Sequence, residues 1–270
     1  MIKMVATDID GTIFNMKTEE FSPRVKNCIK TLSNMGIKVV LVTGRMHTST
    51  YFLADELELD TPVVSYQGGL IKENKKDGKT LYRKDLDKDT AKEIIKWAKQ
   101  NNIHINLYMD DVLYVENDDE IIKRYTYLRN VSYNVVNFDD IEIDNVNKLL
   151  AIDYDNPDKA TQWRDYLREK YPELSIVKSS QYFCEISDSG AKKSCAVEFL
   201  RKMWGFSQDE VLTIGDQDND IELLKSGGIK VAMGNGTQNL KEVADFVTDT
   251  IDNDGFVKAV EKFIINCREQ

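Results

Sequence analysis

The stretch "MVATDIDGTIF" (residues 4–14) places two carboxylates at the point where a buried strand ends. The apolar residues at its start predict the strand, and Asp8 and Asp10 follow it, separated by a single residue. Gly11 then allows the chain to turn. Because two carboxylates this close repel each other, we expect a positive charge to lie between them.

The whole chain is acidic, with 36 Lys and Arg against 46 Asp and Glu among 270 residues and a net charge of −10. Such a chain lacks the broad basic surface that neutralises the phosphates of a nucleic acid, so we expect no nucleic-acid partner. A small anionic substrate remains compatible with this charge, because a few local donors and a cation can outweigh it. The length suits one large domain or two smaller ones.

The cysteines and histidines are too few and too scattered to predict a zinc site, and we expect reduced thiols. They are Cys28, Cys184, Cys195, Cys267, His47 and His104. The first residues lack the long apolar core of a signal peptide, and no apolar run approaches the ~20 residues that cross a membrane. The sequence therefore predicts a cytoplasmic protein with no membrane partner.

Strand and helix signals alternate over the first 72 residues and again from about residue 190. The first part contains predicted strands at 4–9, 37–44 and 62–66 and helices at 22–36 and 48–59. The second contains helices at 192–205, 219–228, 237–244 and 254–266 and strands at 210–215, 229–233 and 245–249. Ser22 as N-cap, Pro23 and the final Gly36 bound the first helix. The alternation predicts a doubly wound α/β sheet.

Between these parts the pattern changes to helices beside hairpins. Helices are predicted at 88–102 and 157–171, and strands at 103–109, 112–117, 148–154, 174–179 and 182–187. Asp110 and Asp111 predict a tight turn between the first two of these strands. We therefore predict an α/β fold with a Rossmann-like parallel-sheet core at 1–81 and 189–270 and an inserted α+β cap domain at 82–188.

Polar residues follow four of the predicted core strands. They are Asp8 with Asp10, Thr43-Gly44-Arg45, Gln67-Gly68-Gly69, and Gly215-Asp216 with Asn219-Asp220. Ligands of open α/β sheets bind outside the carboxyl ends of the strands, so these residues are expected to share one edge. Asp8, Asp10 and Asp216 would then converge and require a cation. A hard divalent ion with oxygen ligands fits, and Mg²⁺ is the natural candidate.

Each of these patterns has a plainer interpretation when taken alone. A pair of aspartates in a turn is often a solvated cap, and Thr-Gly-Arg after a strand is often the start of a helix. The pattern Gly-Asp-x-x-Asn-Asp also occurs in Asp-rich turns and weak calcium loops. Their joint occurrence at successive strand ends favours a functional site over these separate explanations.

The motifs together resemble those of the haloacid-dehalogenase-like phosphatase superfamily, and within it the Cof-type sugar phosphatases. The matching stretches are "DIDGT" (8–12), "VTGR" (42–45), "GAKKS" (190–194) and "IGDQDND" (214–220), with weaker matches at "VAMGNG" (231–236) and "ADFVTDTIDNDG" (244–255). The resemblance spans the chain and implies a Rossmann-like core with an inserted cap.

The resemblance also implies a role for each matching residue. Asp8 would be the nucleophile that forms an aspartyl-phosphate, and Asp10 would be the general acid and then the base. Lys193 would neutralise the transferred phosphoryl group. The implied metal ligands are Asp8, Asp216 and the backbone carbonyl of Asp10, with Asp220 supporting them. The implied phosphate-binding groups are the amides of Ile9 and Gly44 and the side chains of Thr43, Lys193 and Asn219.

Three positions require a choice or depart from the family pattern. The spacing Gly-x-x-Lys from Gly190 selects Lys193, and Lys192 is then a solvated lysine at the start of a helix. Gln67 stands where the family typically has Asn before Gly, which leaves the role of this amide open. Ser194 stands where a glycine is common after the lysine, and it is compatible with a helix N-terminus.

The resemblance implies a magnesium-dependent phosphatase that hydrolyses a small phosphomonoester, such as a sugar phosphate. Two alternatives remain open at this point. A phosphomutase of the same superfamily would use the same aspartates but return the phosphoryl group to its substrate. A non-catalytic regulator would bind sugar phosphates without needing an acid/base residue. We expect His47 to lie at a helix start and His104 to be structural.

Overall fold

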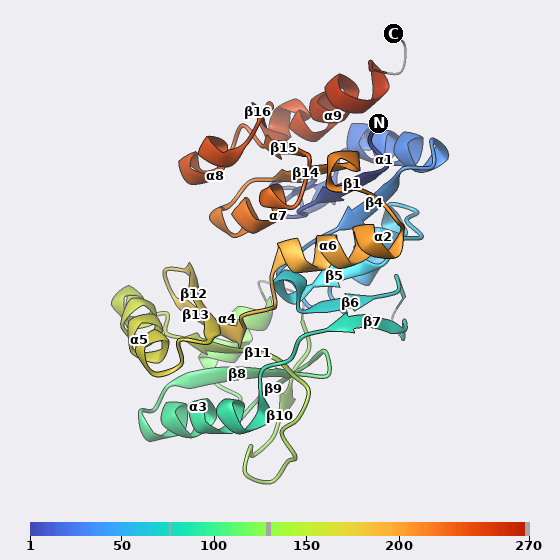
Figure 1. Ribbon diagram of the computed structural model, residues 1–270. Helices are drawn as coiled ribbons and strands as arrows, with labels where there is room; N and C mark the ends of the chain where they lie inside the picture. The colour runs from blue at the N-terminus through green and yellow to red at the C-terminus, as the bar shows by residue number, and fades with distance from the viewer. Residues whose placement is uncertain (76, 128–130, 268–270) are drawn as a thin grey trace. The chain divides into compact units, whose positions relative to one another are not determined.

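The computed structural model describes residues 1–75, 77–127 and 131–267 (Figure 1). The chain divides into two compact units. The core unit comprises Met1–Tyr82 and Lys192–Gln270, and the inserted unit comprises Arg83–Ala191. The predicted role of the inserted segment as a cap over the site stays a prediction.

The core unit is built on a sheet of five parallel strands in the order β16-β15-β14-β1-β4. These strands are β1 (Met4–Thr7), β4 (Lys38–Leu41), β14 (Val211–Gly215), β15 (Ile229–Ala232) and β16 (Phe246–Val247). Met4 of β1 pairs with Val211 on one side and Lys38 on the other. The two halves of the core sequence therefore meet inside one sheet, as predicted.

Helices cover both faces of this sheet (Figure 1). One face packs against α1 (Pro23–Asn34), α2 (Tyr51–Glu56) and α9 (Gly255–Val260), and the other against α6 (Lys193–Met203) and α7 (Ile221–Lys225). The remaining core helices are α8 (Gln238–Val243), η1 (Tyr66–Gly68), η2 (Gln208–Glu210), η3 (Asp218–Asp220), η4 (Ile251–Asn253) and the π-helical η5 (Glu261–Ile265). Burial of both faces explains why the core strands are almost continuously apolar.

The local signals at the first helix act as expected. The Ser22 hydroxyl accepts a hydrogen bond from the Val25 amide at 3.2 Å, and Pro23 occupies the first helical position. The second helix is shorter than predicted, because residues 47–50 form hydrogen-bonded turns before α2 begins. Glu58 has a φ of 54°, which ends the helix early.

Two small sheets outside the main parallel sheet were not predicted. Strands β2 (Phe14–Asn15) and β3 (Glu20–Phe21) form one of them. Strands β5 (Val63–Ser65), β6 (Leu70–Lys72) and β7 (Thr80–Arg83) form the other. The predicted third parallel strand is thus β5, but its main partner is the antiparallel β6. A single parallel bridge between Val42 and Val64 links it to the end of β4.

The inserted unit contains a mainly antiparallel sheet in the order β10-β9-β8-β11-β13-β12. Its strands are β8 (His104–Met109), β9 (Val112–Val115), β10 (Asn134–Val135), β11 (Val146–Ile152), β12 (Leu174–Ser180) and β13 (Phe183–Asp188). Its helices are α3 (Lys88–Gln100), α4 (Glu120–Tyr127) and α5 (Pro157–Lys170). Asp110 and Asp111 both have positive φ and form the predicted hairpin turn.

The α/β architecture with a parallel-sheet core confirms the predicted fold class. Within the part of the chain that the structure describes, none of the helices combines the length and apolar composition needed to cross a bilayer.

Candidate active site

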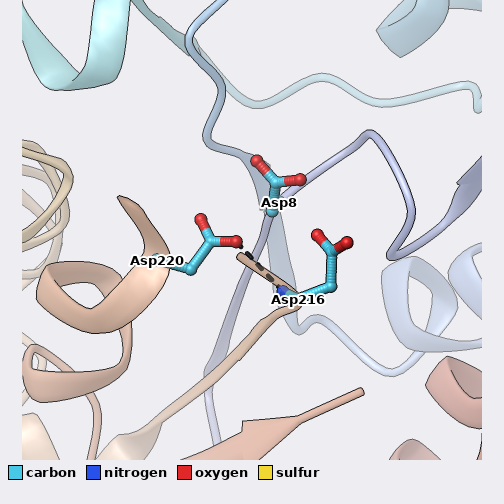
Figure 2. A group of neighbouring side chains, drawn as sticks. All are labelled: Asp8, Asp216 and Asp220. Carbon is cyan, nitrogen blue, oxygen red and sulfur yellow. Dashed lines mark hydrogen bonds between the residues drawn. The ribbon is translucent and has the colours of Figure 1, made fainter. Parts of the chain in front are cut away.

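Three of the predicted carboxylates form a group at the carboxyl edge of the core sheet, with Asp220 in the place that the sequence had given to Asp10. Asp8 directly follows β1 and Asp216 directly follows β14, the neighbouring parallel strand. Asp220 lies one turn further on, at the end of η3. Figure 2 shows the three side chains as neighbours that project in the same direction, and a carboxylate oxygen from each lies within 4.8 Å of the others. All three side chains are buried.

One ammonium group lies inside this cluster, between Asp8 and Asp220 rather than between Asp8 and Asp10, where the opening motif led us to expect a positive charge. Lys193 is the first residue of α6, and its side chain is 1% exposed. Its Nζ donates to Asp8 Oδ1 at 2.6 Å and to Asp220 Oδ1 at 2.6 Å. Lys192 is exposed to solvent. The structure therefore brings the second lysine of "GAKKS" to the carboxylates.

Asp220 organises the loop that follows β14. While its Oδ1 binds Lys193, its Oδ2 accepts hydrogen bonds from the amides of Asp216 and Gln217, at 3.0 and 3.1 Å. Both of its oxygens thus have protein donors. This bonding fixes the Asp216 backbone and the Lys193 ammonium relative to each other.

Burial sets the electrostatics of the cluster. Desolvation, followed by the charge of Asp220, raises the pKa of Asp8 well above its usual value, although Lys193 opposes this rise. Desolvation also raises the pKa of Asp216 to about 6. Burial disfavours the charged form of Lys193, but Asp220 and Asp8 outweigh that effect and raise the pKa of its ammonium. The lysine is therefore held charged among carboxylates that are short of positive charge.

The donor set fits a divalent cation. With all groups ionised, the three carboxylates and one ammonium leave an excess of two negative charges in a buried space. A set of closely spaced carboxylate oxygens suits a hard ion such as Mg²⁺. The Asp216 side chain is oriented by the Thr12 hydroxyl at 3.3 Å and by Gln217 Nε2 at 2.8 Å. Mg²⁺ itself stays a prediction.

Asp10 has a different environment from Asp8. Its carboxylate accepts two hydrogen bonds from Arg45, at 2.8 Å from Nε and 2.5 Å from Nη2. The Arg45 guanidinium also lies over the Phe14 ring, 5.4 Å from its centroid. Sequence reasoning noted Arg45 only as part of a motif. Its position at the end of β4, beside the strand that leads into Asp10, was the signal that could have paired them.

The groups predicted to bind phosphate lie near the same edge. Thr43 is buried, and its hydroxyl accepts a hydrogen bond from the Arg45 amide at 3.2 Å. Gly44 follows it in the bend after β4. The side chain of Ile9 is in the core, and its carbonyl accepts hydrogen bonds from the turn that follows. Phosphate binding by these groups stays a prediction.

Asn219 makes a contact that was not predicted. Its Nδ2 donates to Gln67 Oε1 at 3.2 Å, which joins the loop after β14 to the turn after β5. Gln67 had been noted only as a departure from the family pattern. Nothing in the sequence indicates this pair, because it depends on how two loops 152 residues apart are folded.

The remaining candidates have structural surroundings. His47 precedes α2 and is buried, with its Nε2 3.0 Å from the Lys75 carbonyl oxygen. His104, in β8, contacts Asp119 at 2.8 Å and Asn106 at 2.9 Å within the inserted unit. All four cysteines are free thiols.

The chain is similar to characterised and solved proteins along nearly its whole length. A model of haloacid dehalogenase-like hydrolases matches residues 5–260. A haloacid dehalogenase-like hydrolase from Bacteroides thetaiotaomicron is 28% identical with a TM-score of 0.87, covering 98% of this chain and 100% of that one. A protein from Thermotoga maritima is 30% identical with a TM-score of 0.87, covering 97% and 98%. A 5-amino-6-(5-phospho-D-ribitylamino)uracil phosphatase from Bacillus subtilis is 28% identical over 266 residues, covering 98% of this chain and 96% of that protein.

These similarities confirm the family resemblance that the motifs indicated and the predicted enzyme class, a phosphoric monoester hydrolase of this type. The match extends from the first core strand through the inserted unit to α9, so it includes every motif on which the resemblance was based. The chain belongs to the haloacid dehalogenase-like hydrolases.

Proposed function

We propose that this protein is a magnesium-dependent phosphatase that hydrolyses a small phosphorylated metabolite through an aspartyl-phosphate. The observation that carries the proposal is the pair of 2.6 Å contacts from Lys193 Nζ to Asp8 and Asp220. A buried ammonium beside a buried carboxylate places transition-state charge stabilisation next to a nucleophile. Binding alone would need no such arrangement.

The first half of the reaction transfers the phosphoryl group to the protein. A carboxylate oxygen of Asp8 attacks phosphorus, a new O–P bond forms, and the bond from phosphorus to the ester oxygen breaks. The Asp10 carboxyl donates its proton to the departing alkoxide, which leaves as an alcohol. Lys193 balances charge on the phosphoryl oxygens as it develops.

The second half releases phosphate. Asp10, now a carboxylate, accepts a proton from water, and the water oxygen attacks phosphorus while the bond to Asp8 breaks. The products are inorganic phosphate and the original Asp8 and Asp10. The bidentate contact with Arg45 would hold Asp10 in one orientation while it is a carboxylate, in the interval between the two half-reactions.

The residues that would hold the metal are Asp8, Asp216 and the backbone carbonyl of Asp10, with Asp220 fixing the loop around them. A bound Mg²⁺ would supply positive charge to the carboxylates and to the phosphate oxygens. Thr43, Gly44, Asn219 and the amide of Ile9 would bind the remaining phosphate oxygens.

The substrate class that we propose is a sugar phosphate or a similar phosphorylated polyol. The Bacillus subtilis relative is named for a substrate that carries a phosphorylated ribityl chain. The acidic character of this chain also favours a small substrate over a nucleic acid.

Phosphate release from a panel of sugar phosphates, polyol phosphates and an aryl phosphate would test this function. We expect turnover with Mg²⁺, none in excess chelator, and recovery when Mg²⁺ is returned. Calcium should support turnover poorly, because its larger and looser coordination misplaces the carboxylates. Full activity in chelator would contradict the proposal. A requirement for a bisphosphorylated activator would indicate a mutase, and binding without turnover would indicate a regulator.

A further inference from the structure

The turn after β5 has an unusual backbone. Tyr66, Gln67 and Gly68 have φ values of 52°, 57° and 104°, so three successive residues lie in the left-handed region. Only glycine adopts this region without cost, and residues held there tend to cluster at functional sites. Tyr66 is buried, and its amide donates to the Arg45 carbonyl at 3.0 Å.

This turn contacts three parts of the proposed active site. The backbone amide of Gln67 donates to the Thr43 carbonyl at 3.0 Å, which joins the turn to the Thr43–Gly44 loop, the proposed phosphate loop. A Cβ at Gly68 would overlap the carbonyl oxygen of Lys192, so the turn lies directly against the start of α6. The Gln67 side chain contacts Asn219. These contacts all lie within the core unit.

The oxygen and the nitrogen of the Gln67 side-chain amide have different neighbours. Oε1 accepts the hydrogen bond from Asn219 Nδ2 at 3.2 Å. Nε2 lies against Gly44, at 2.5 Å from the position that a Cβ would take there. The amide therefore occupies the space beside the phosphate loop that a side chain at position 44 would fill, and it spans from that loop to Asn219.

We propose that Gln67 is a positioning residue that ties Asn219 to the Thr43–Gly44 loop, so that both bind the substrate's phosphate in a fixed geometry. The inference rests on the proposed phosphatase function and assigns a role to the amide that departs from the family pattern. Asn219 is exposed and lies on the loop after β14. Without the hydrogen bond to Gln67, its side chain would populate several rotamers. The longer side chain of Gln67 supplies the reach that this contact needs.

Three substitutions separate the amide from the backbone of the turn. Gln67→Gly removes the amide and accepts a φ of 57° without strain. Gln67→Asn keeps an amide and tolerates the left-handed region, but it is one methylene shorter. Gln67→Glu keeps an oxygen that can accept from Asn219 but places a negative charge beside the phosphate site. Gln238→Ala, an exposed glutamine on α8, serves as the control.

We expect Gln67→Gly and Gln67→Asn to raise KM for a phosphomonoester and Ki for inorganic phosphate about tenfold, with kcat within about threefold of the wild type. Phosphate is present in both the ground and transition states, so its loss of binding appears in KM. Gln67→Glu should weaken phosphate binding further. The double variant Gln67→Gly/Asn219→Ala should match Asn219→Ala within about twofold, because the two residues act together.

Several results would overturn the inference. Wild-type KM in Gln67→Gly would show that only the backbone of the turn matters. Additive effects in the double variant would show that Gln67 does not act through Asn219. A fall in kcat with unchanged KM would point instead to a displaced Lys193.

The same variants distinguish this inference from the proposed function. If the wild type turns over phosphomonoesters and the Gln67 variants do not differ from it, only the inference fails. If the wild type turns over none of them, the proposed function fails, and the rise in Tm caused by inorganic phosphate then decides the inference. Loss of the phosphate-induced rise in Tm in Gln67→Gly but not in Gln238→Ala would support the positioning role of Gln67. An equal rise in Tm in both variants would contradict it.

Discussion

Each unit of the molecule contains a buried lysine, and the two lysines have different surroundings. Lys193 lies at the start of α6, beyond the strand ends of the core sheet, and contacts carboxylates that follow two different strands. Lys148 lies within β11 of the inserted unit. Its Nζ is 3.1 Å from Glu185 on the adjacent strand and 5.0 Å from the centroid of the Tyr108 ring.

The difference lies in the balance of charge. Lys148 and Glu185 balance each other within the sheet, as a cross-strand pair does in many proteins. Lys193 is outnumbered by the carboxylates around it. A balanced pair can serve the fold alone, whereas a buried excess of negative charge needs a further cation and is costly without one. The comparison separates a lysine in a balanced ion pair from one for which we propose a chemical role.

The substitution Asp8→Asn should have the largest effect. It keeps the shape of the side chain but removes the anionic nucleophile, so turnover should fall by several orders of magnitude. Phosphate release at saturating substrate measures this. Near-normal turnover would end the aspartyl-phosphate hypothesis and remove the chemical half of the comparison.

Lys193→Ala should lower kcat about 10²–10³-fold, by analogy with the removal of one oxyanion donor. Lys192→Ala is the matched control, since this neighbouring lysine is exposed, and it should stay within a few-fold of the wild type. Steady-state kinetics of the two variants decide between them. The opposite ranking would place the motif one residue away.

Arg45→Met should affect substrates according to their leaving group. Without its bidentate partner, Asp10 loses a fixed orientation. The turnover of alkyl phosphates should fall about tenfold, because their leaving groups need a proton donor. The phenolate of an aryl phosphate leaves without such help, so the turnover of aryl phosphates should stay within about threefold of the wild type. Arg45→Lys keeps the charge but not the bidentate contact, so its turnover of alkyl phosphates should lie between those of the wild type and Arg45→Met. Equal losses on both substrate types would exclude a link from Arg45 to proton transfer.

Lys148→Met should affect stability more than chemistry. Glu185 would lose the Lys148 ammonium in a largely buried position, which costs about 1–3 kcal/mol, so Tm should fall by several degrees. The kcat for an aryl phosphate should stay within about threefold. Lys148→Met/Glu185→Leu should recover stability, because it removes both charges. A loss of kcat like that of Lys193→Ala would contradict the assignment of a structural role to Lys148 and a chemical role to Lys193.

The metal-free protein should lose stability as pH rises through about 6. The folded state raises the pKa of Asp216 to about 6 by desolvation, from the usual 3.8, so the folded chain binds this proton more tightly than the unfolded chain. The resulting stability is full below pH 3.8 and is lost as pH rises through about 6. Thermal unfolding in chelator from pH 4 to 7.5 measures it, and Asp216→Asn should weaken this dependence. Added Mg²⁺ should restore Tm at pH 7, and a flat profile would contradict the buried negative excess.

Local signals in the sequence predicted much of the fold. Ser22 and Pro23 marked the start of α1, and the two aspartates of the β8–β9 hairpin marked its turn. Three of the missed strands, β2, β3 and β10, have two residues each, too few to show an alternating pattern. Strand β5 was predicted correctly, but its antiparallel partner was not, because pairing depends on contacts that periodicity does not record.

The candidate site followed the same division. The topology of parallel strands was sufficient to bring Asp8 and Asp216 to one edge. The pairs Asp10–Arg45 and Gln67–Asn219 join loops, and their geometry depends on side-chain rotamers and left-handed backbone that single-residue patterns do not specify. Sequence reasoning therefore predicted the carboxylates and the lysine that lie together, but not the pairs Asp10–Arg45 and Gln67–Asn219.

The central position of β1 has a consequence for how the protein is made. Its neighbour β14 is synthesised some 200 residues later, after the whole inserted unit has been synthesised. The inserted segment is continuous and has its own apolar core, so it can fold while the core sheet still lacks its middle pairing. Asp8 and Lys193, 185 residues apart, meet only when that long loop closes. A nascent chain thus carries Asp8, the proposed nucleophile, for most of its synthesis without Lys193, Asp216 or Asp220.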